Sequence, residues 1–359
     1  MNLEKNFKNK KILITGHTGF KGSWLTTWFL ILGAKVIGIS NGTPTSPSHY
    51  KLLNLKNKII DKKLDIKNLK KLKIIVNKYQ PDYVFHLAAQ AIVKKSYEDP
   101  INTWNSNTLG TINILESLRV LKKKCVVVLI TSDKSYKNLE IKRGYTENDK
   151  LGGEDPYSAS KACADIAIQS YINSFFKKKR TSVFIAIGRA GNVVGGGDWS
   201  PFRLIPDCIR SWSVNKKATI RNPNSTRPWQ HVLEALFGYI VLAVKLNKNK
   251  NLHGEVFNFG PSNRYNYKVI DVVRLMKKIW KNVNWKIVKN NNFKESALLK
   301  LNSKKAKKKL NWKSILTFRE NISLVAKWYK YFNFKPKTTF QITSEQILEY
   351  QKKINKRIY

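Results

Sequence analysis

Short runs of consecutive apolar residues alternate with helix-length segments through the first half of the chain. The runs lie at residues 10–15, 35–40, 82–90, 125–132 and 182–188. Continuous apolar strands that alternate with helices are typical of a parallel sheet covered on both faces, with right-handed crossovers. The pattern therefore predicts an α/β fold, a Rossmann-type doubly wound parallel sheet.

The alternation weakens beyond about residue 190, where the loops contain more Gly, Pro, Trp and Arg. We expect residues 1–189 to form a nucleotide-binding Rossmann domain and residues 190–359 to form a smaller, mixed α/β C-terminal lobe that binds the substrate. The stretch 229–246 predicts an apolar helix, and we expect about 229–260 to return partly to the first lobe. Residues 318–332 predict an amphipathic helix.

Composition narrows the class of protein. With 359 residues, 42% hydrophobic and 25% charged, the chain is long and apolar enough to bury a sizeable core. The net charge of +44 would attract polyanions. Because the lysines are spread over the whole length among many asparagines, we expect solvated faces and no dedicated nucleic-acid role.

The N-terminus lacks the apolar region of a secretory signal, and no apolar run approaches the ~20 residues of a membrane helix. We therefore expect no membrane association. The odd and widely spaced cysteines fit a reducing cytoplasm, and the scattered histidines offer no metal site. The cysteines are Cys125, Cys163 and Cys208.

Three glycines lie between the first predicted strand and the first long helix, at Gly16, Gly19 and Gly22. A turn of this kind lets backbone N–H groups and the positive end of a helix approach a pyrophosphate. The spacing is GxxGxxG and not GxGxxG, so its position in the chain carries the signal. Lys21, inside this loop, would face either pyrophosphate or solvent.

The second predicted strand ends in Ser40 and Asn41, where dinucleotide-binding folds commonly have an acidic residue for the adenosine ribose. The loop by itself leaves NAD and NADP open. No arginine stands nearby to receive a 2′-phosphate, which favours NAD.

Tyr157 and Lys161 are four residues apart, on one face of a predicted helix. A phenol acts as a base near neutral pH only if its phenolate is stabilised, and an ammonium group one turn away does this. The spacing by itself is common by chance.

Together with Ser132, which ends a later strand, this order of motifs resembles the short-chain dehydrogenase/reductase family. The length and the long C-terminal half resemble its extended, sugar-nucleotide-modifying branch. The resemblance implies that Ser132, Tyr157 and Lys161 are a catalytic trio and that the cofactor is NAD. It also implies a set of cofactor contacts: Gly16, His17, Thr18, Gly19, Phe20, Gly22, Asp65, Ile66, Leu87, Ala88, Ala89, Tyr157 and Lys161.

The 4,6-dehydratases of this branch add an acid and a base directly after the strand hydroxyl, commonly Asp-Glu. Here the pair is Asp133-Lys134, in "TSDK". Together with "GHTGFKG", "GGEDPYSASK", "RAGNVVGGGDW" and "RNPNSTRPWQHVLEA", it resembles the dehydratases that act on CDP-hexoses, from about residue 10 to at least 261. The resemblance implies a lyase whose substrate is CDP-D-glucose. The change from Glu to Lys puts the identity of the base in question, not the type of reaction.

In the implied reaction Tyr157 takes the proton of the sugar 4-hydroxyl, Lys134 removes the C5 proton and Asp133 protonates the departing 6-hydroxyl. An aspartic acid that donates must have a raised pKa, and a lysine that acts as a base must be neutral. In their ordinary states the two residues would form a mere ion pair, which is the structural alternative.

The second half is expected to hold the nucleotide sugar. Arginine forks suit a diphosphate because they bind it bidentately and remain charged. By resemblance and by residue type, the expected substrate contacts are Gln90, Asn107, Asn192, Arg203, Leu204, Arg221, Arg227 and Asn258.

Other functions remain open at this point. The chain is alternatively a dehydratase or 4-epimerase for another nucleotide sugar, although an epimerase has no use for Asp133 and Lys134. From a different class, it is a basic nucleic-acid-binding protein that retains the fold without catalysis. The resemblance further implies a homodimer that supplies a deoxysugar for surface polysaccharide.

Overall fold

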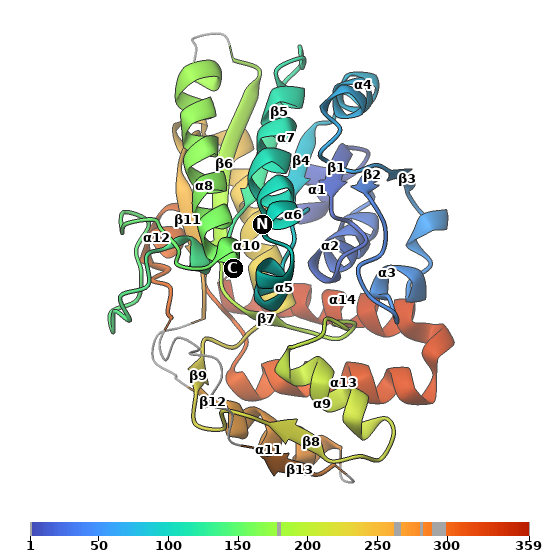
Figure 1. The fold of residues 1–359 in the computed structure, drawn as a ribbon. Helices are drawn as coiled ribbons and strands as arrows, with labels where there is room; N and C mark the ends of the chain where they lie inside the picture. The colour runs from blue at the N-terminus through green and yellow to red at the C-terminus, as the bar shows by residue number, and fades with distance from the viewer. Residues whose placement is uncertain (1, 178–180, 262–266, 281–282, 289–298, 359) are drawn as a thin grey trace.

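The computed structural model describes residues 2–177, 181–261, 267–280, 283–288 and 299–358. Among these residues, seven parallel strands form one sheet in the order β11-β6-β5-β4-β1-β2-β3 (Figure 1). The strands are β1 Lys11–Thr15, β2 Lys35–Ser40, β3 Ile60–Lys63, β4 Tyr83–His86, β5 Cys125–Ile130, β6 Val183–Ala190 and β11 Val256–Phe259. The predicted Rossmann-type parallel sheet is confirmed.

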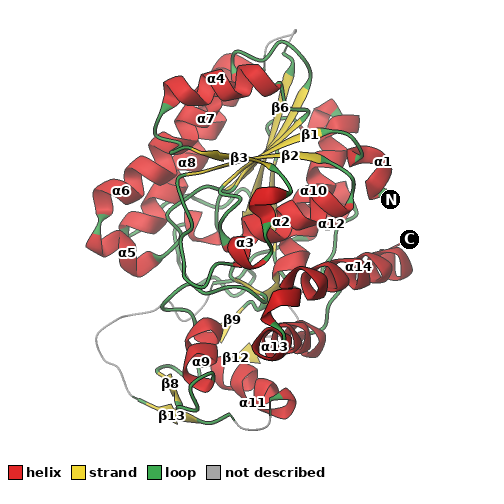
Figure 2. Ribbon diagram, turned by 90° about the vertical axis from the view of Figure 1, so that its right-hand side faces the viewer, coloured by secondary structure: helices red, strands yellow, loops and turns green. Residues whose placement is uncertain are grey.

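Helices cover both faces of the sheet, as Figure 2 shows edge-on. Burial on both sides explains why β5 and β6 are buried at every position, with no polar alternation. One face carries α4 Leu69–Tyr79, α7 Gly110–Leu118 and α8 Pro156–Tyr171. The other carries α1 Leu3–Phe7, α2 Phe20–Ile31, α10 Val232–Lys248 and α12 Lys304–Leu310, while α14 Thr339–Ile358 packs against α2 and α13 Phe318–Phe334 packs against α14.

Shorter helical pieces lie between these elements. They are α3 His49–Leu52, η1 Leu55–Asn57, α5 Val93–Glu98, α6 Pro100–Trp104, the π-helical turn η2 Asn105–Leu109, η3 Asp133–Ser135, η4 Ile172–Phe176, η5 Lys250–Leu252 and η6 Pro336–Thr338.

The second lobe lies below the sheet in Figure 1, on the side where β6 continues into β7. It holds α9 and α11 and short strand pairs, β7 with β10, β8 with β13 and β9 with β12. Their bounds are β7 Val193–Val194, α9 Leu204–Trp212, β8 Ala218–Ile220, β9 Thr226–Arg227, β10 Gln230–His231, β12 Tyr267–Lys268, α11 Val269–Ile279 and β13 Trp285–Ile287.

The chain crosses between the lobes more than once. After the second lobe begins, α10 packs against β5 and β6, and β11 joins the edge of the sheet beside β6. The C-terminal helix α14 packs against α2. Consequently the loops at the ends of β5 and β6 are held between structure from both halves of the sequence.

Candidate active site

The turn between β1 and α2 has no room for side chains at two of its glycines. Gly16 has φ +73°, and a Cβ there would lie 2.7 Å from the backbone nitrogen of Ala88. A Cβ on Gly22 would lie 2.1 Å from the carbonyl oxygen of Gly16. Gly19 caps α2, so the N–H groups of the first turn have no partner within the helix. This is the geometry that accepts an anionic group.

The other residues of the loop support it from within. His17 is buried, with its Nε2 3.0 Å from Asp61 Oδ1, so only its backbone can face a ligand. The Thr18 hydroxyl donates to the Gly42 carbonyl at 2.6 Å. Phe20, partly buried, packs against the main core.

The ends of β2 and β3 bring two polar side chains together. Asn41 Nδ2 donates to Asp65 Oδ2 at 3.3 Å, and the Asp65 side chain is about one-third exposed. Ile66, next to it, is buried against Gly110. The second strand has no acidic residue at its end. The Asn41 amide and the Asp65 carboxylate lie there instead.

The loop after β4 closes the far side of the glycine turn. Leu87, Ala88 and Ala89 are partly buried, and Ala88 N donates to Thr15 Oγ1 at 3.3 Å. Gln90 continues this loop, and its side-chain amide binds Ile92 and Thr103. Its amide groups thus order the loop.

Asn107 and Asn258, both predicted from the sequence as substrate contacts, lie in the interior of the protein. Asn107 is 1% exposed, and its amide bonds to Gln90 and Ser160. Asn258 is 0% exposed, and its amide bonds to Tyr136 and Tyr145. Both amides make hydrogen bonds inside the protein and support the site from there, and their contact with the substrate stays a prediction.

The residues after β5 form a compact hydroxyl–carboxyl turn. Ser132 Oγ donates to Asp133 Oδ1 at 3.0 Å and accepts from Lys134 N at 3.2 Å. Burial raises the pKa of Asp133, against the lowering effects of Lys134, Ser132 and Lys21. A Cβ on Gly191, just beyond β6, would lie 2.9 Å from Asp133 Oδ2, so the end of β6 borders this carboxyl group.

Tyr157 and Lys161 lie on α8, which packs against this turn. Asp155 caps the helix by accepting from the backbone N–H groups of Tyr157 and Ser158 at 3.0 Å each. Burial raises the pKa of Tyr157, while its hydrogen bond with Ser132 lowers it. Burial and the charge of Lys21 lower the pKa of Lys161 to about 8. The predicted catalytic trio and Asp133 are therefore neighbours.

Two cations that are distant in the sequence join them. Arg203, from the second lobe, pairs with Asp198 at 2.8 Å, and its charge acts on Tyr157. Lys21 points into the protein: burial and Arg203 lower its pKa to about 8, while Asp133 acts in the opposite direction. From the sequence, the direction of the Lys21 side chain remained open. Asp198 was not singled out as a partner of Arg203, although it precedes Arg203 by only five residues.

The remaining predicted substrate residues line the second lobe. Leu204 begins α9 directly after Arg203, Arg227 lies in β9 beside β12, and both are partly buried. Asn192, after β6, and Arg221, after β8, are exposed. The structure brings Arg203 close to the catalytic group and leaves Arg221 toward the surface, where its charge acts on Asp207.

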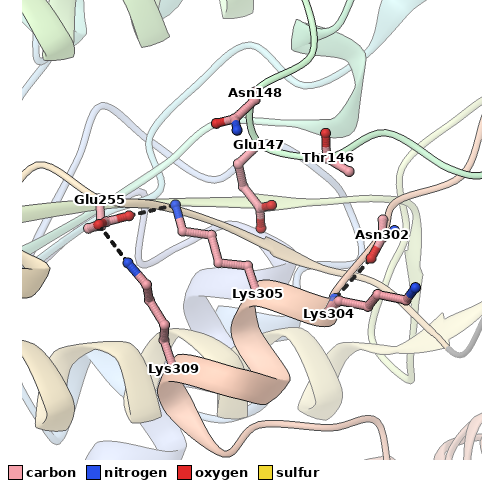
Figure 3. A pocket seen from close by; sticks show the side chains of 8 residues that line it. All are labelled: Thr146, Glu147, Asn148, Glu255, Asn302, Lys304, Lys305 and Lys309. Carbon is pink, nitrogen blue, oxygen red and sulfur yellow. Dashed lines mark hydrogen bonds and ion pairs between the residues drawn. The ribbon is translucent and has the colours of Figure 1, made fainter.

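A surface pocket of about 440 Å³ lies elsewhere, around the start of α12 (Figure 3). Figure 3 shows Lys305 and Lys309 both directed at Glu255, with N···O distances of 2.5 and 2.9 Å. Because these cations are paired within the protein, we do not assign this pocket to an anionic ligand.

Neither a membrane helix nor a metal site occurs in the described part of the chain. None of its helices is long and apolar enough to cross a membrane. Among the same residues, no group of three or more His, Cys, Asp or Glu side chains could hold a metal ion.

Known proteins share this fold and much of this sequence. Residues 13–325 match the family described as GDP-mannose 4,6 dehydratase. The CDP-glucose 4,6-dehydratase of Salmonella typhimurium is 42% identical over 333 residues, which cover 91% of this chain and 93% of that protein.

Solved structures agree in fold. An epimerase of Methanothermobacter thermautotrophicus superimposes with a TM-score of 0.79 at 22% identity, covering 94% of this chain and 97% of that one. The dTDP-glucose 4,6-dehydratase of Bacillus anthracis, solved in complex with NAD, has a TM-score of 0.73 at 21% identity, with 89% and 96% covered. With the family match spanning most of the sheet and the second lobe, this chain belongs to the nucleotide-sugar 4,6-dehydratase family of extended short-chain dehydrogenase/reductases.

Proposed function

We propose that this protein is an NAD-dependent lyase that converts CDP-D-glucose to CDP-4-dehydro-6-deoxy-D-glucose. The observation that carries the proposal is the adjacent carboxyl–amine couple Asp133-Lys134, placed beside Ser132 and Tyr157 at the end of β5. The 42% identical relative named for this reaction supports the choice of sugar nucleotide.

The residues present fit NAD. The glycine turn whose spaces a Cβ would fill suits the pyrophosphate, and Asn41 with Asp65 offers polar groups for the adenosine. Lys161, one turn from Tyr157 on α8, would donate to a ribose hydroxyl. When bound, the cofactor supplies the redox chemistry, accepting hydride from C4 of the sugar and returning it to C6.

Tyr157 begins the reaction by accepting the proton of the 4-hydroxyl as C4 becomes a ketone. The hydrogen bond between Tyr157 and Ser132 lowers the pKa of the phenol, and the charge of Arg203 acts in the same direction. Lys161, in its protonated form, adds a further positive charge one helical turn away. These three neighbours oppose the effect of burial, which on balance raises the pKa of the phenol.

Elimination follows because the ketone acidifies the C5 hydrogen. Lys134 removes that proton, and Asp133 donates its own proton to the 6-hydroxyl, which leaves as water. Burial keeps Asp133 protonated to higher pH than an exposed aspartic acid. Lys134, after its protons exchange with solvent, then delivers a proton to C5. The proton taken from the 4-hydroxyl restores Asp133, so the net change is the loss of one water.

For the nucleotide diphosphate we assign Arg203 and Arg227 from the second lobe, with Asn192 and Leu204 beside them. Guanidinium groups bind the two phosphates bidentately. Arg203 supports this best, because its charge reaches both the catalytic tyrosine and Asp198. Arg221, at the exposed end of the lobe, is a weaker candidate than these two arginines.

The decisive experiment incubates purified protein with CDP-, dTDP-, GDP- and UDP-hexoses in D₂O and follows mass. We expect loss of water and gain of one solvent deuteron at C5 with CDP-D-glucose. Water loss with another base would move the assignment to that nucleotide. Unchanged mass with inverted C4 would make the protein a 4-epimerase. A protein inert to all four, with tight and steeply salt-dependent binding to RNA or DNA, would fit the non-catalytic alternative.

We further propose a homodimer in the cytoplasm. Ile101 of α6, Leu109 of η2 and Ile166 of α8 are 69%, 51% and 55% exposed on neighbouring helices, and a second copy would bury them. The described cysteines are all free, in keeping with a reducing compartment. Light scattering should give a dimer mass for the wild type and a monomer for Ile166→Glu. Ile74→Glu, an equally exposed position on α4, should remain dimeric.

A further inference from the structure

A fully buried ion pair lies directly behind the catalytic residues. Asp165 of α8 and Arg189 of β6 are 0% and 2% exposed. Arg189 Nη2 donates to Asp165 Oδ1 and Arg189 Nε to Oδ2, each at 2.7 Å, which is a bidentate arrangement. The hydroxyl of Thr131 donates to the same Oδ2 at 2.9 Å. One carboxylate therefore joins α8, β6 and the end of β5.

The positions of these groups in the chain relate them to the catalysts. Asp165 follows Lys161 by four residues, as Lys161 follows Tyr157, so the three share one face of α8. Thr131 immediately precedes Ser132 and Asp133. The bond from Thr131 to Asp165 thus ties the helix that holds the base for C4 oxidation to the turn that holds the groups for elimination.

The guanidinium of Arg189 connects the ion pair to the other end of the turn that holds Asp133 and Lys134. Arg189 Nη1 donates to the hydroxyl of Tyr136 at 2.8 Å, and this hydroxyl donates to Asn258 Oδ1 at 2.8 Å. Tyr136 follows Lys134 by two residues. Residues 132–135 are therefore held at both ends, by Thr131 on one side and Tyr136 on the other, and both ends lead to the same ion pair.

Two charges out of water destabilise a fold unless they are paired and hydrogen-bonded, and apolar side chains of similar volume would fill the space at lower cost. The ion pair fixes the relative orientation of α8, β6 and the end of β5, because a bidentate contact with two further hydrogen bonds has a single good geometry. An apolar cluster would leave the end of β5 free to shift against α8.

We propose that Asp165 and Arg189, with Thr131 and Tyr136, are positioning residues that hold Tyr157 and Lys161 in register with Asp133 and Lys134. One hexose ring can then meet both the oxidation and the elimination groups without moving. The inference rests on the proposed function, since only a reaction in two such stages needs both sets aligned.

The mildest test is Thr131→Val, which removes the hydroxyl and keeps shape and charge. We expect kcat with CDP-D-glucose to fall about 10- to 100-fold, as small displacements of catalytic groups do, with KM changed less than twofold. Thr27→Val is the matched control. Thr27 is 0% exposed, and its hydroxyl bonds only within α2, to the Ser23 carbonyl at 2.9 Å. It should retain wild-type kcat.

Asp165→Asn gives a second readout, the pH profile. The charged and titratable groups that face Lys161 are Lys21 from α2, His86 from β4, and Asp165 and Tyr157 from its own helix. Asp165 raises the pKa of Lys161, and burial keeps His86 neutral. Since Lys161 acts protonated, its loss of a proton ends activity as pH rises. Removing the carboxylate should move this alkaline limb to lower pH, whereas Thr131→Val should leave it in place.

The outcomes separate the two claims. If the wild type turns over CDP-D-glucose and Thr131→Val has the same kcat, the positioning role is contradicted but the proposed function is not. The same holds if the alkaline limb of Asp165→Asn lies at the wild-type pH. A rise in KM that accounts for the whole loss also contradicts it. If Asp165→Asn does not fold, Thr131→Val decides. A wild type that turns over none of the four sugar nucleotides contradicts the proposed function, and the inference falls with it.

Discussion

At the scale of single residues, two neighbours in the chain acquire different environments within one short turn. Asp133 is 3% exposed, while Lys134 is only partly buried. Burial raises the pKa of the carboxyl group, although the adjacent ammonium group opposes this. An acid that stays protonated to higher pH is what protonation of the departing 6-hydroxyl requires of Asp133.

Replacing Lys134 with Met should stop water loss and leave C4 oxidation intact, because Tyr157 and Lys161 are untouched. Stopped-flow absorbance should show formation of reduced cofactor. The mass of the sugar nucleotide in D₂O should show neither deuterium at C5 nor loss of water. Lys137→Met is the control, since Lys137 is exposed three residues further on. Normal dehydration by Lys134→Met would exclude Lys134 as the base.

The pH dependence of elimination should follow Asp133. The donor is active when protonated, so the rate falls as pH rises through a pKa that burial has raised. Asp133→Asn keeps the shape and cannot donate in the same way; we expect a loss of about 10²–10⁴-fold and no such limb in the residual activity. If this limb survives in Asp133→Asn, and is not the Lys161 limb that Asp165→Asn moves, it belongs to another group.

At the scale of elements, the contact between the β1–α2 turn and the start of α2 depends on missing side chains. The closest approach is at Gly22, where an added Cβ would meet the backbone of Gly16 and not a movable side chain. The helix N-terminus can therefore sit against the turn and direct its free N–H groups outward. The spacing of the glycines in the sequence follows from this close packing.

Gly22→Ala should displace α2 from the turn. We expect the free energy of unfolding to fall by about 1–3 kcal/mol and NAD affinity to fall by at least about tenfold, measured by urea denaturation and by quenching of tryptophan fluorescence. Gly42→Ala is matched, because its Cβ would meet nothing within 4 Å. Equal behaviour of the two variants would mean that the turn tolerates a side chain.

At the scale of the whole molecule, one buried carboxyl group connects distant segments. Glu234 of α10 accepts from the backbone N–H groups of Ile315 and Leu316, at 2.9 and 2.6 Å, and from the hydroxyl of Tyr350 in α14 at 3.1 Å. The helix that crosses back onto the sheet is thereby attached to the C-terminal region. Burial raises the pKa of Glu234 to about 7.

This attachment should make stability depend on pH. The unfolded chain loses the Glu234 proton near pH 4.5, and the folded protein keeps it until about pH 7. The folded state therefore binds more protons in this window, and the free energy of unfolding should fall as pH rises, by about 3 kcal/mol in total. Denaturation of Glu234→Gln should lack this slope between pH 5 and 7. An identical slope in both proteins would rule Glu234 out as its source.

Prediction from the sequence succeeded where the signal was local and failed where it was not. The apolar runs located β1, β2, β4, β5 and β6, and the apolar stretch 229–246 coincides with most of α10. β3, Ile60–Lys63, was missed because its residues Asp61, Lys62 and Lys63 carry no apolar pattern. The sequence likewise has no signal for the direction of the Asn258 amide, which lies in β11 and bonds to Tyr136 and Tyr145.

Local patterns in the sequence by themselves predicted the parallel sheet and the pairing of Tyr157 with Lys161, whereas the other reactive groups were named from the family resemblance. Both depend on neighbours within a few residues: continuous apolar runs demand cover on two faces, and a helical spacing of four places Tyr157 and Lys161 together. Only the tertiary structure decided which polar residues face the site. Arg203, Asp133 and Lys21 meet through the crossing of the lobes, and Asp165 finds Arg189 across α8 and β6. Such meetings depend on long-range packing, which no local pattern records.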